Sequence, residues 1–282
     1  MTKVQSPADN KQSSELPRGV FAELCRLNSD LYLVGGPIRD ALLHRPCHDW
    51  DFVCRHARRV ARRLSRKLRA SFVALDEQNR IYRVIVPSPQ PSPYGRGRSE
   101  AAGEAGWTLD FAELQGKSIE EDLSHRDLTV NAMARLFPTG KIIDPYRGQR
   151  DLKSGTIRAV SEKAFTEDPL RLLRAFRFQA QFQFVIELKT LRWIKKAVSA
   201  YRRIGVSAKQ QDVTPSRSHA ATPIRTVSAE RIREELLRLW KQPSSSGSLK
   251  MMDKVGLLSG IFPEVEACRR TAIRYYGKGG SS

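Results

Sequence analysis

The sequence predicts a chain in two parts, a mixed α/β front half built on a sheet and an all-helical back half. Two observations support this fold class. Short segments rich in β-branched and aromatic residues recur in the front half, which is typical of strands. From about residue 155 onward, apolar residues recur at helical spacing instead.

The front half contains five predicted strands, with a basic predicted helix between the second and the third of them. The segment LYLVGG is a short apolar run ending in a glycine pair, and DWDFVC alternates acidic residues on one face with Trp50 on the other. The predicted helix carries Val60, Leu64 and Leu68 as one apolar stripe. In order, the elements span a strand at 31–36, a strand at 49–54, the helix at 55–69, and strands at 71–75, 81–86 and 107–111.

Two segments are expected to be insertions, and the first 28 residues are expected to form a polar tail. Residues 87–106 are rich in Pro, Gly and Ser, which disfavours a packed element. In residues 206–226 the triplet Val-Ser-Ala ends one helical pattern and recurs at 227–229 as the next begins. Removing the intervening residues would join the two patterns into one helix.

The helical half opens with AFTEDPLRLLRAFRFQAQF, where Thr166 or Asp168 is the expected cap and Pro169 lies in the first turn. A later helix, VSAERIREELLRLW, has Ser228 as its cap but lacks a complete capping box. We therefore expect a head at 29–154, a helical neck at 155–268 and a tail at 269–282.

Charge and composition narrow the function classes. The 282 residues carry 49 Lys and Arg against 30 Asp and Glu, a formal charge of +19, so a polyanionic partner such as nucleic acid or anionic lipid is expected. No apolar run reaches the roughly 18 residues that span a bilayer, and the first residues lack a secretory signal. Four cysteines without a CxxC pair indicate a reducing compartment, the cytoplasm. The histidines and cysteines between 44 and 56 fit no common zinc spacing.

The predicted helix at 55–69 is the most basic segment, with eight Lys or Arg and no acidic residue. Such a helix either binds the phosphates of RNA or is an ordinary solvated face, and the residues leave both interpretations open. The residues expected to bind RNA are Arg58, Arg59, Arg62, Arg63 and Arg66.

Asp49 and Asp51 are the sharpest chemical feature. Alternate residues of a strand share a face, so the two carboxylates lie about 7 Å apart along it. Such oxygen ligands suit Mg²⁺, and a pair of ions can activate a hydroxyl and stabilise a leaving phosphate. Asp110 on a neighbouring strand is a candidate third carboxylate. The alternative for each is a polar strand position without function.

Two further groups could contact a nucleotide. Gly35 and Gly36 would let the backbone approach a triphosphate, and Arg39 could meet its charge. Further on, Arg126 could donate to a phosphate or ribose, and the spacing of Asp127 and Asn131 puts both on one face of a predicted helix. A turn that needs small residues and a structural salt bridge are the alternatives.

In the helical half, Asp168 and Arg171 are one turn apart, with Arg174 one turn further. A carboxylate accepts from an exocyclic amine while a guanidinium donates to a ring acceptor, so this pair would select C and A over U and G. An ordinary salt bridge of about 0.2–0.5 kcal/mol is the alternative.

Together these segments resemble the bacterial-type tRNA nucleotidyltransferase and poly(A) polymerase family, the CCA-adding enzymes and their relatives. The resemblance covers roughly residues 31–265, less the insertions, and rests on five motifs in the family's order: LVGGPIRDALLHRPCHDWDF, EEDLSHRDLTVNAMA, IIDPYRGQRDL, EDPLRLLRAFRF and SAERIREELLRL.

The resemblance implies a polymerase-β-like nucleotidyltransferase head with a mixed sheet, followed by a helical neck. It implies that Asp49 and Asp51 hold two Mg²⁺ ions, with Asp110 at the position of a further carboxylate. By the same resemblance, Arg126, Asp127 and Asn131 contact ribose and phosphates, while Asp168 and Arg171 read the base.

Three features depart from the family pattern. His125 replaces the first of two arginines, and the family's C-terminal body and tail domains are not recognised in this sequence. The loop from Leu114 to Ser118 is short, as in CC-adding members, whereas full CCA-adding relatives have a longer flexible loop. The expected function is template-independent addition of C or A, or both, from CTP and ATP to tRNA 3′ ends. A poly(A) polymerase and a non-catalytic RNA-binding protein remain the alternatives.

Overall fold

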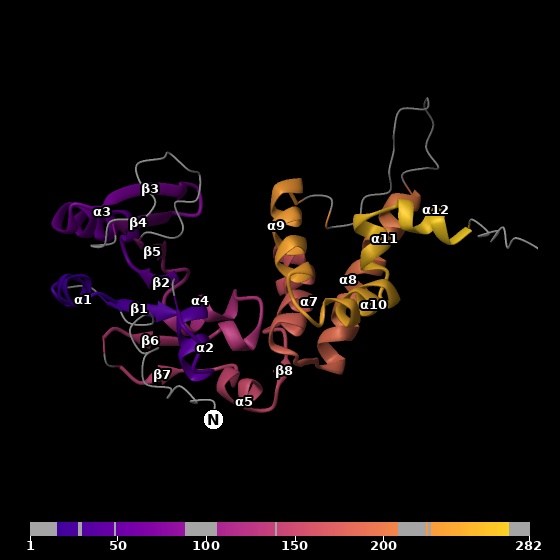
Figure 1. Ribbon diagram of the computed structural model, residues 1–282, viewed down its shortest axis with the longest axis horizontal. Helices are drawn as coiled ribbons and strands as arrows, with labels where there is room; N and C mark the ends of the chain where they lie inside the picture. Colours follow the sequence, from indigo (N-terminus) through magenta and orange to yellow (C-terminus); the bar gives the residue numbers. More distant parts are fainter. Residues whose placement is uncertain are drawn as a thin grey trace, which may run out of the picture. The chain divides into compact units, whose positions relative to one another are not determined.

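The computed structural model of the protein describes residues 16–27, 30–47, 49–87, 106–138, 140–207, 224 and 227–270. These residues form two compact units, with the boundary between Ser154 and Gly155. Figure 1 shows the order of the elements along the chain. The expected insertions at 87–106 and 206–226 lie almost entirely outside the described residues.

The first unit contains a seven-stranded mixed sheet in the order β3-β4-β5-β2-β1-β6-β7. Strands β2 and β5 are parallel, and the other neighbouring strands are antiparallel. All five predicted strands are present. Two more, β6 and β7, were not predicted, because two or three residues show no alternation. The strands are β1 (Leu31–Val34), β2 (Asp49–Cys54), β3 (Ser71–Asp76), β4 (Ile81–Pro87), β5 (Gly106–Glu113), β6 (Ala134–Leu136) and β7 (Ile142–Ile143).

One face of this sheet, here called the carboxylate face, carries Asp49 and Asp51. Strand alternation puts Val53 on the same face. Helix α4 (Ile119–Ser124) covers part of it, since Ile119 and Leu123 pack in one buried cluster with Val53. This apolar contact leaves the beginning of β2 as the polar end of the face.

The opposite face is covered by helix α3 (Ala57–Leu68), and helix α1 (Arg18–Cys25) packs against α3. Phe52 and Phe111 stack here with ring centroids 5.3 Å apart. Figure 1 shows α3 beside β3 and β4, and its Val60 and Leu64 are buried as the predicted stripe requires. Helix α1 corrects the expected polar tail, because a segment that lacks a long apolar run still buries two side chains at helical spacing, Val20 and Leu24.

Three short elements complete the first unit: α2 (Gly36–Leu42), the 3₁₀ helix η1 (Thr129–Asn131) and α5 (Gly148–Lys153). The hydroxyl of Thr129 donates to Asp151 at 2.7 Å, which fixes η1 against α5.

The second unit is helical apart from one two-stranded parallel sheet, β8 (Thr156–Ile157) with β9 (Val185–Ile186). This small sheet was not predicted, because strands of two residues show no alternation. Helix α7 is central and packs against α9 and α10. The helices are α6 (Ala164–Glu167), α7 (Leu170–Phe182), α8 (Leu188–Ser207), α9 (Ala229–Trp240), α10 (Ser245–Lys254), α11 (Leu257–Ile261) and α12 (Glu264–Arg270).

Helix starts follow local chemistry. Ser228 caps α9, and its hydroxyl accepts from the Arg231 amide, as the sequence predicts. Helix α7 begins at Leu170, two residues beyond Asp168, whose carboxylate accepts from the Leu170 amide at 3.1 Å. None of the helices in the described ranges is both long and apolar enough to cross a membrane.

Candidate active site

Asp49 and Asp51 begin β2 and lie on the carboxylate face, where Asp51 is in register with Asp110 of β5. Burial and, after it, the negative charges of Asp110 and Asp49 together raise the pKa of Asp51 to about 6, against the opposing charges of Arg126 and Arg39. Negative charge at this end of the sheet therefore exceeds what the nearby arginines offset.

Asp110 is held by a residue that sequence reasoning missed. Arg83 of β4 donates through Nε and Nη2 to the two carboxylate oxygens of Asp110, each at 2.7 Å. Its position between Tyr82 and Val84, which are buried on the opposite face, is the signal that could have placed it here. Each oxygen of Asp110 thus accepts one hydrogen bond and keeps a second lone pair, so Asp110 stays a candidate third carboxylate.

The glycine pair shapes the approach to Asp51. Gly35 has a φ of 68°, a left-handed conformation that favours glycine, and its amide donates to the Met133 carbonyl at 3.0 Å. A Cβ on Gly36 would lie 3.7 Å from Oδ2 of Asp51 and 3.7 Å from Nη2 of Arg39. A side chain at Gly36 would therefore stand beside the carboxylate, and glycine keeps that space open.

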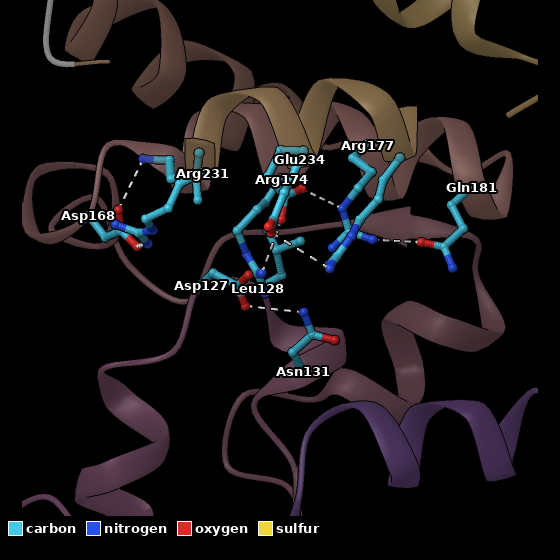
Figure 2. Close-up of polar contacts among 12 residues, drawn as sticks. Asp127, Leu128, Asn131, Asp168, Arg174, Arg177, Gln181, Arg231 and Glu234 are labelled. Carbon is cyan, nitrogen blue, oxygen red and sulfur yellow. Dashed lines mark hydrogen bonds and ion pairs between the residues drawn. The ribbon is translucent and has the colours of Figure 1, made fainter. Parts of the chain in front are cut away.

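Arg39 is fixed by three hydrogen bonds and is only 8% exposed. It donates through Nε and Nη2 to both oxygens of Asp40, each at 2.9 Å, and through Nη1 to the side-chain oxygen of Asn131 at 2.6 Å. Asn131 in turn donates to Asp127 at 3.1 Å, a contact shown in Figure 2. Asp127 and Asn131 are buried and link η1 to Arg39.

The predicted helix through Asp127 and Asn131 is wrong. Helix α4 ends at Ser124, Leu128 is extended, and Asn131 ends the 3₁₀ helix. The turn is stable because Asp127 accepts from the amide of Leu128 at 2.8 Å as well as from Asn131, which draws the chain out of a helical path.

Arg126 lies at the edge of the site. Its Nη2 donates to Asp122 at 3.0 Å, and its positive charge lowers the pKa of Asp51. Asp122 is buried and also accepts from the Gln115 amide at 3.1 Å.

The short loop between β5 and α4 is tied to the helix that follows it. Ser118 accepts from the Glu121 amide at 3.3 Å, and Glu121 accepts from the Lys117 amide at 2.7 Å. Ser118 thus caps α4, and Glu121 reaches the amide one residue before the cap, as in a variant of the capping box. Together with the bond from the Gln115 amide to Asp122, these bonds tie both ends of the loop to α4.

The five arginines expected to bind RNA lie on the exposed side of α3. They line a groove of about 1120 Å³ together with Arg80 and others. Because α3 packs on the face opposite Asp49 and Asp51, these arginines do not share the face of the candidate metal ligands.

In the second unit, Asp168 and Arg171 have different partners. Asp168 accepts from Nη2 of Arg231 on α9 at 2.8 Å (Figure 2). Arg171 donates to the Ala164 carbonyl at 3.2 Å and to Glu167 at 3.3 Å. Asp168 also precedes α7 rather than lying within it, because Pro169 follows it and bars a helical path there. Arg231 is the second residue that sequence reasoning missed.

Arg174 is bound to a buried carboxylate. It lies 3.6 Å from Glu235, which is 5% exposed, and Arg177 donates to the same carboxylate at 2.6 Å. Burial lowers the pKa of Arg177 to about 10, and the charge of Glu235 opposes that shift. Figure 2 shows Arg174 and Arg177 side by side on α7.

No group of three or more His, Cys, Asp or Glu side chains within the described ranges is arranged to hold a metal ion. Burial raises the pKa of the Cys47 and Cys54 thiols to about 12, which does not suit zinc thiolates. Asp49 and Asp51 therefore offer two carboxylates, to which a substrate would have to add further oxygen ligands.

Comparison with known proteins identifies both units. Residues 31–158 match the family model of the poly A polymerase head domain, and residues 214–269 match that of the probable RNA and SrmB-binding site of polymerase A.

Among similar proteins, a CC-adding tRNA nucleotidyltransferase of Synechocystis sp. is 34% identical over 263 residues, covering 92% of this chain and 53% of its own. A multifunctional CCA protein of Neisseria gonorrhoeae is 34% identical over 239 residues, covering 84% and 50%. The structure of a Thermotoga maritima CCA-adding enzyme complexed with tRNA matches with a TM-score of 0.66 at 28% identity, covering 87% of this chain and 51% of that one.

The chain thus spans about half the length of the curated relatives it matches. Both family models fall on the segments whose motifs resemble the family, and the solved structures share the sheet-plus-helices architecture. The chain belongs to the bacterial-type tRNA nucleotidyltransferase and poly(A) polymerase family.

Proposed function

We propose that this protein is a template-independent nucleotidyltransferase that adds C or A, or both, from CTP and ATP to the 3′ end of tRNA in the cytoplasm. One observation carries the proposal: Asp49 and Asp51 lie on one face of β2 with excess negative charge around them. The names of the relatives, CC-adding tRNA nucleotidyltransferase and multifunctional CCA protein, support the choice of substrate.

Asp49 and Asp51 would hold Mg²⁺. The raised pKa of Asp51 marks a site where carboxylate charge is not fully offset, which is the environment that a divalent cation stabilises. Two such ions would supply a lowered pKa for the attacking hydroxyl and compensation for charge on the leaving group. Asp110 would join this set through the second lone pair of an oxygen that already accepts a hydrogen bond from Arg83.

The chain's own residues would position the substrates. The RNA 3′-oxygen forms a bond to the α-phosphorus of the nucleotide, and the bond from that phosphorus to the bridging oxygen breaks. Pyrophosphate leaves, and the hydroxyl proton passes to water. Gly35 and Gly36 leave room for the triphosphate beside Asp51. Arg39 and Arg126 bring positive charge to the same place, and Asn131 and Asp127 keep Arg39 in position.

In the second unit, Asp168 and Arg171 would read the base, as proposed from the resemblance. The Asp168 carboxylate accepts hydrogen bonds from Arg231 of α9 and from the Leu170 amide, and these two bonds fix its orientation. A carboxylate fixed in this way can accept from the amine of C or A and repel the carbonyl of U or G.

An extension assay tests the proposal. The protein is incubated with Mg²⁺, tRNA ending at the discriminator base, and CTP, ATP or both, and the products are sized to one nucleotide. Addition of C, C and A establishes CCA addition, and a stop after two C residues establishes CC addition, which the tied loop at 114–118 favours. No incorporation by a protein that melts cooperatively and binds tRNA would overturn the proposal in favour of a non-catalytic RNA-binding protein.

Poly(A) polymerase is the second candidate, because the head matches a family model described by that activity. Long tails made from ATP alone in the same assay, on RNA of any 3′ sequence, would establish it instead.

A further inference from the structure

The groove along α3 is a strongly charged surface feature that the proposed chemistry leaves unused. It has a volume of about 1120 Å³, and Arg59, Arg63 and Arg66 line it together with Arg80 from the turn before β4. Among the described residues that line it, Glu113 is acidic. The carboxylate of Glu113 is already bonded to the amides of His56 and Ala57 at 2.7 and 3.0 Å, where it fixes the start of α3.

The cations of α3 are arranged in rows. Residues four apart along a helix rise about 6 Å and lie on one face, so Arg59 and Arg63 form one row and Arg62 and Arg66 another. Arg58 lies 3.6 Å from the exposed Glu77. For Arg59, Arg63 and Arg66, the described part of the chain provides no acidic partner within 4.0 Å. The positive charges on such a surface repel one another until a bound polyanion neutralises them.

The groove offers many cations and little aromatic surface. Among its described lining residues His56 is an exposed imidazole, whereas Tyr82 is only 4% exposed and stacks on Phe72, whose ring also lies 5.2 Å from the Arg62 guanidinium. Single-stranded RNA binds by stacking its bases on exposed aromatic rings, whereas a double helix presents a continuous phosphate backbone. An anionic membrane is disfavoured as well, because the apolar stripe of α3 is buried against the sheet.

We propose that the α3 groove binds the phosphate backbone of the double-helical part of the substrate RNA, away from its 3′ end. The 3′ end must reach Asp49 and Asp51 on the carboxylate face, and α3 lies on the opposite face of the same sheet. The two contacts therefore engage different parts of one RNA, which must pass around the edge of the sheet. This inference rests on the proposed function for the identity of the RNA.

The test compares two substrates of different reach. One is intact tRNA lacking its terminal CCA, and the other is a short hairpin that carries only the acceptor stem. The variant Arg59→Gln/Arg63→Gln/Arg66→Gln removes three cations and retains good helix formers, and the matched control Arg59→Lys/Arg63→Lys/Arg66→Lys keeps the charge. Both are checked for a cooperative thermal melt at the wild-type temperature.

We expect the Gln variant to raise the KM for tRNA by on the order of tenfold at 0.1 M salt and to leave kcat at saturating tRNA within about twofold. The slope of log KM against log salt should fall by about 2 to 3, one for each lost phosphate contact. The KM for the hairpin should change by less than about twofold, and the Lys variant should stay close to wild type for both substrates.

Three results would overturn the inference. An equal rise of KM for tRNA and hairpin would show that the groove binds the RNA near its 3′ end. An unchanged KM for tRNA would show that the groove does not bind the RNA. Loss of binding to phosphatidylserine vesicles with unchanged tRNA binding would assign the groove to a membrane.

If the wild type incorporates no nucleotide, the proposed function fails by itself. Direct tRNA binding by fluorescence anisotropy then tests the groove with the same variants, and an unchanged affinity in the Gln variant would overturn it.

Discussion

Helices α3 and α7 each carry several arginines, but the surroundings of these side chains differ. On α7, Arg177 donates to the buried Glu235, Arg174 lies 3.6 Å from the same carboxylate, and Arg171 donates to Glu167. On α3, Arg59, Arg63 and Arg66 line an open groove, and the acidic residue of its described lining, Glu113, is bonded to backbone amides. The same residue type stabilises the second unit through α7 and, at these three positions of α3, remains available to a ligand.

Two carboxylates differ in the same way as these arginines, because one is neutralised within the fold and the other is not. Glu235 is buried between two arginines, whereas Asp51 is near two other carboxylates and its pKa is raised to about 6. Charge that is matched within the fold contributes to stability, since an unpaired buried charge is costly. Charge left unmatched marks a place where a partner of opposite sign is needed. Substitutions at matched charges should therefore change stability, and substitutions at unmatched charges should change ligand binding or catalysis.

The largest effect is expected at the unmatched carboxylates. Asp49→Asn and Asp51→Asn should each lower kcat for the proposed nucleotide incorporation by about a thousandfold or more, because each removes a proposed metal ligand. Neither should lower the melting temperature, and Glu120→Gln on the surface of α4 is the control. Retained incorporation in Asp49→Asn would break the link between unmatched charge and catalysis.

The next effect is expected at the matched carboxylate. Glu235→Gln should lower the free energy of unfolding of the second unit by about 3–5 kcal/mol, because it leaves Arg174 and Arg177 around a neutral group. Chemical denaturation at pH 7 measures it. The neighbouring Glu234→Gln removes an exposed pair with an N–O distance of 4.0 Å and should cost less than about 0.5 kcal/mol. Equal losses in the two variants would show that burial of Glu235 contributes nothing.

A smaller effect is expected for the ion pair between Arg231 and Asp168, because it supports the proposed base-reading site. Arg231→Gln removes the ion pair that fixes Asp168, and we expect discrimination between CTP and UTP in kcat/KM to fall by about tenfold. The overall fold should persist, because Arg231 is exposed. The exposed Arg233→Gln on the same helix should leave discrimination unchanged. If discrimination survives in Arg231→Gln, the pair is structural only.

The smallest effect is a dependence of stability on pH without Mg²⁺. The folded-state pKa of Asp51 is raised from 3.8 to about 6, so its favourable contribution is present below about pH 4 and is lost as pH rises through about 6. Asp51→Asn should therefore melt a few degrees above wild type at pH 7.5, and the difference should shrink toward pH 4. Adding Mg²⁺ should close the gap at pH 7.5 by stabilising only the wild type. A gap independent of pH would show that Asp51 does not titrate in this range.

Much of the fold was predictable because its signals are local. The alternation in DWDFVC placed Asp49 and Asp51 on one face, and the stripe through Val60 and Leu64 placed the buried side of α3. Strands of two or three residues, such as β7, lack enough residues for a period to show. The turn at Asp127 was misjudged as a helix, because a spacing of four fits a helix as well as the side-chain bond that replaced it.

The sequence alone determined which residue types lie together along each strand and helix: the acidic pair of β2, the basic side of α3 and the cap of α9. These follow from backbone periodicity and from bonds between near neighbours. Only the tertiary structure decided that Arg83 holds Asp110, that Asn131 holds Arg39, and that Arg231 holds Asp168. Each of these bonds joins elements whose pairing depends on how strands and helices pack, and residues 27 to 92 positions apart carry no mutual signal in a single sequence.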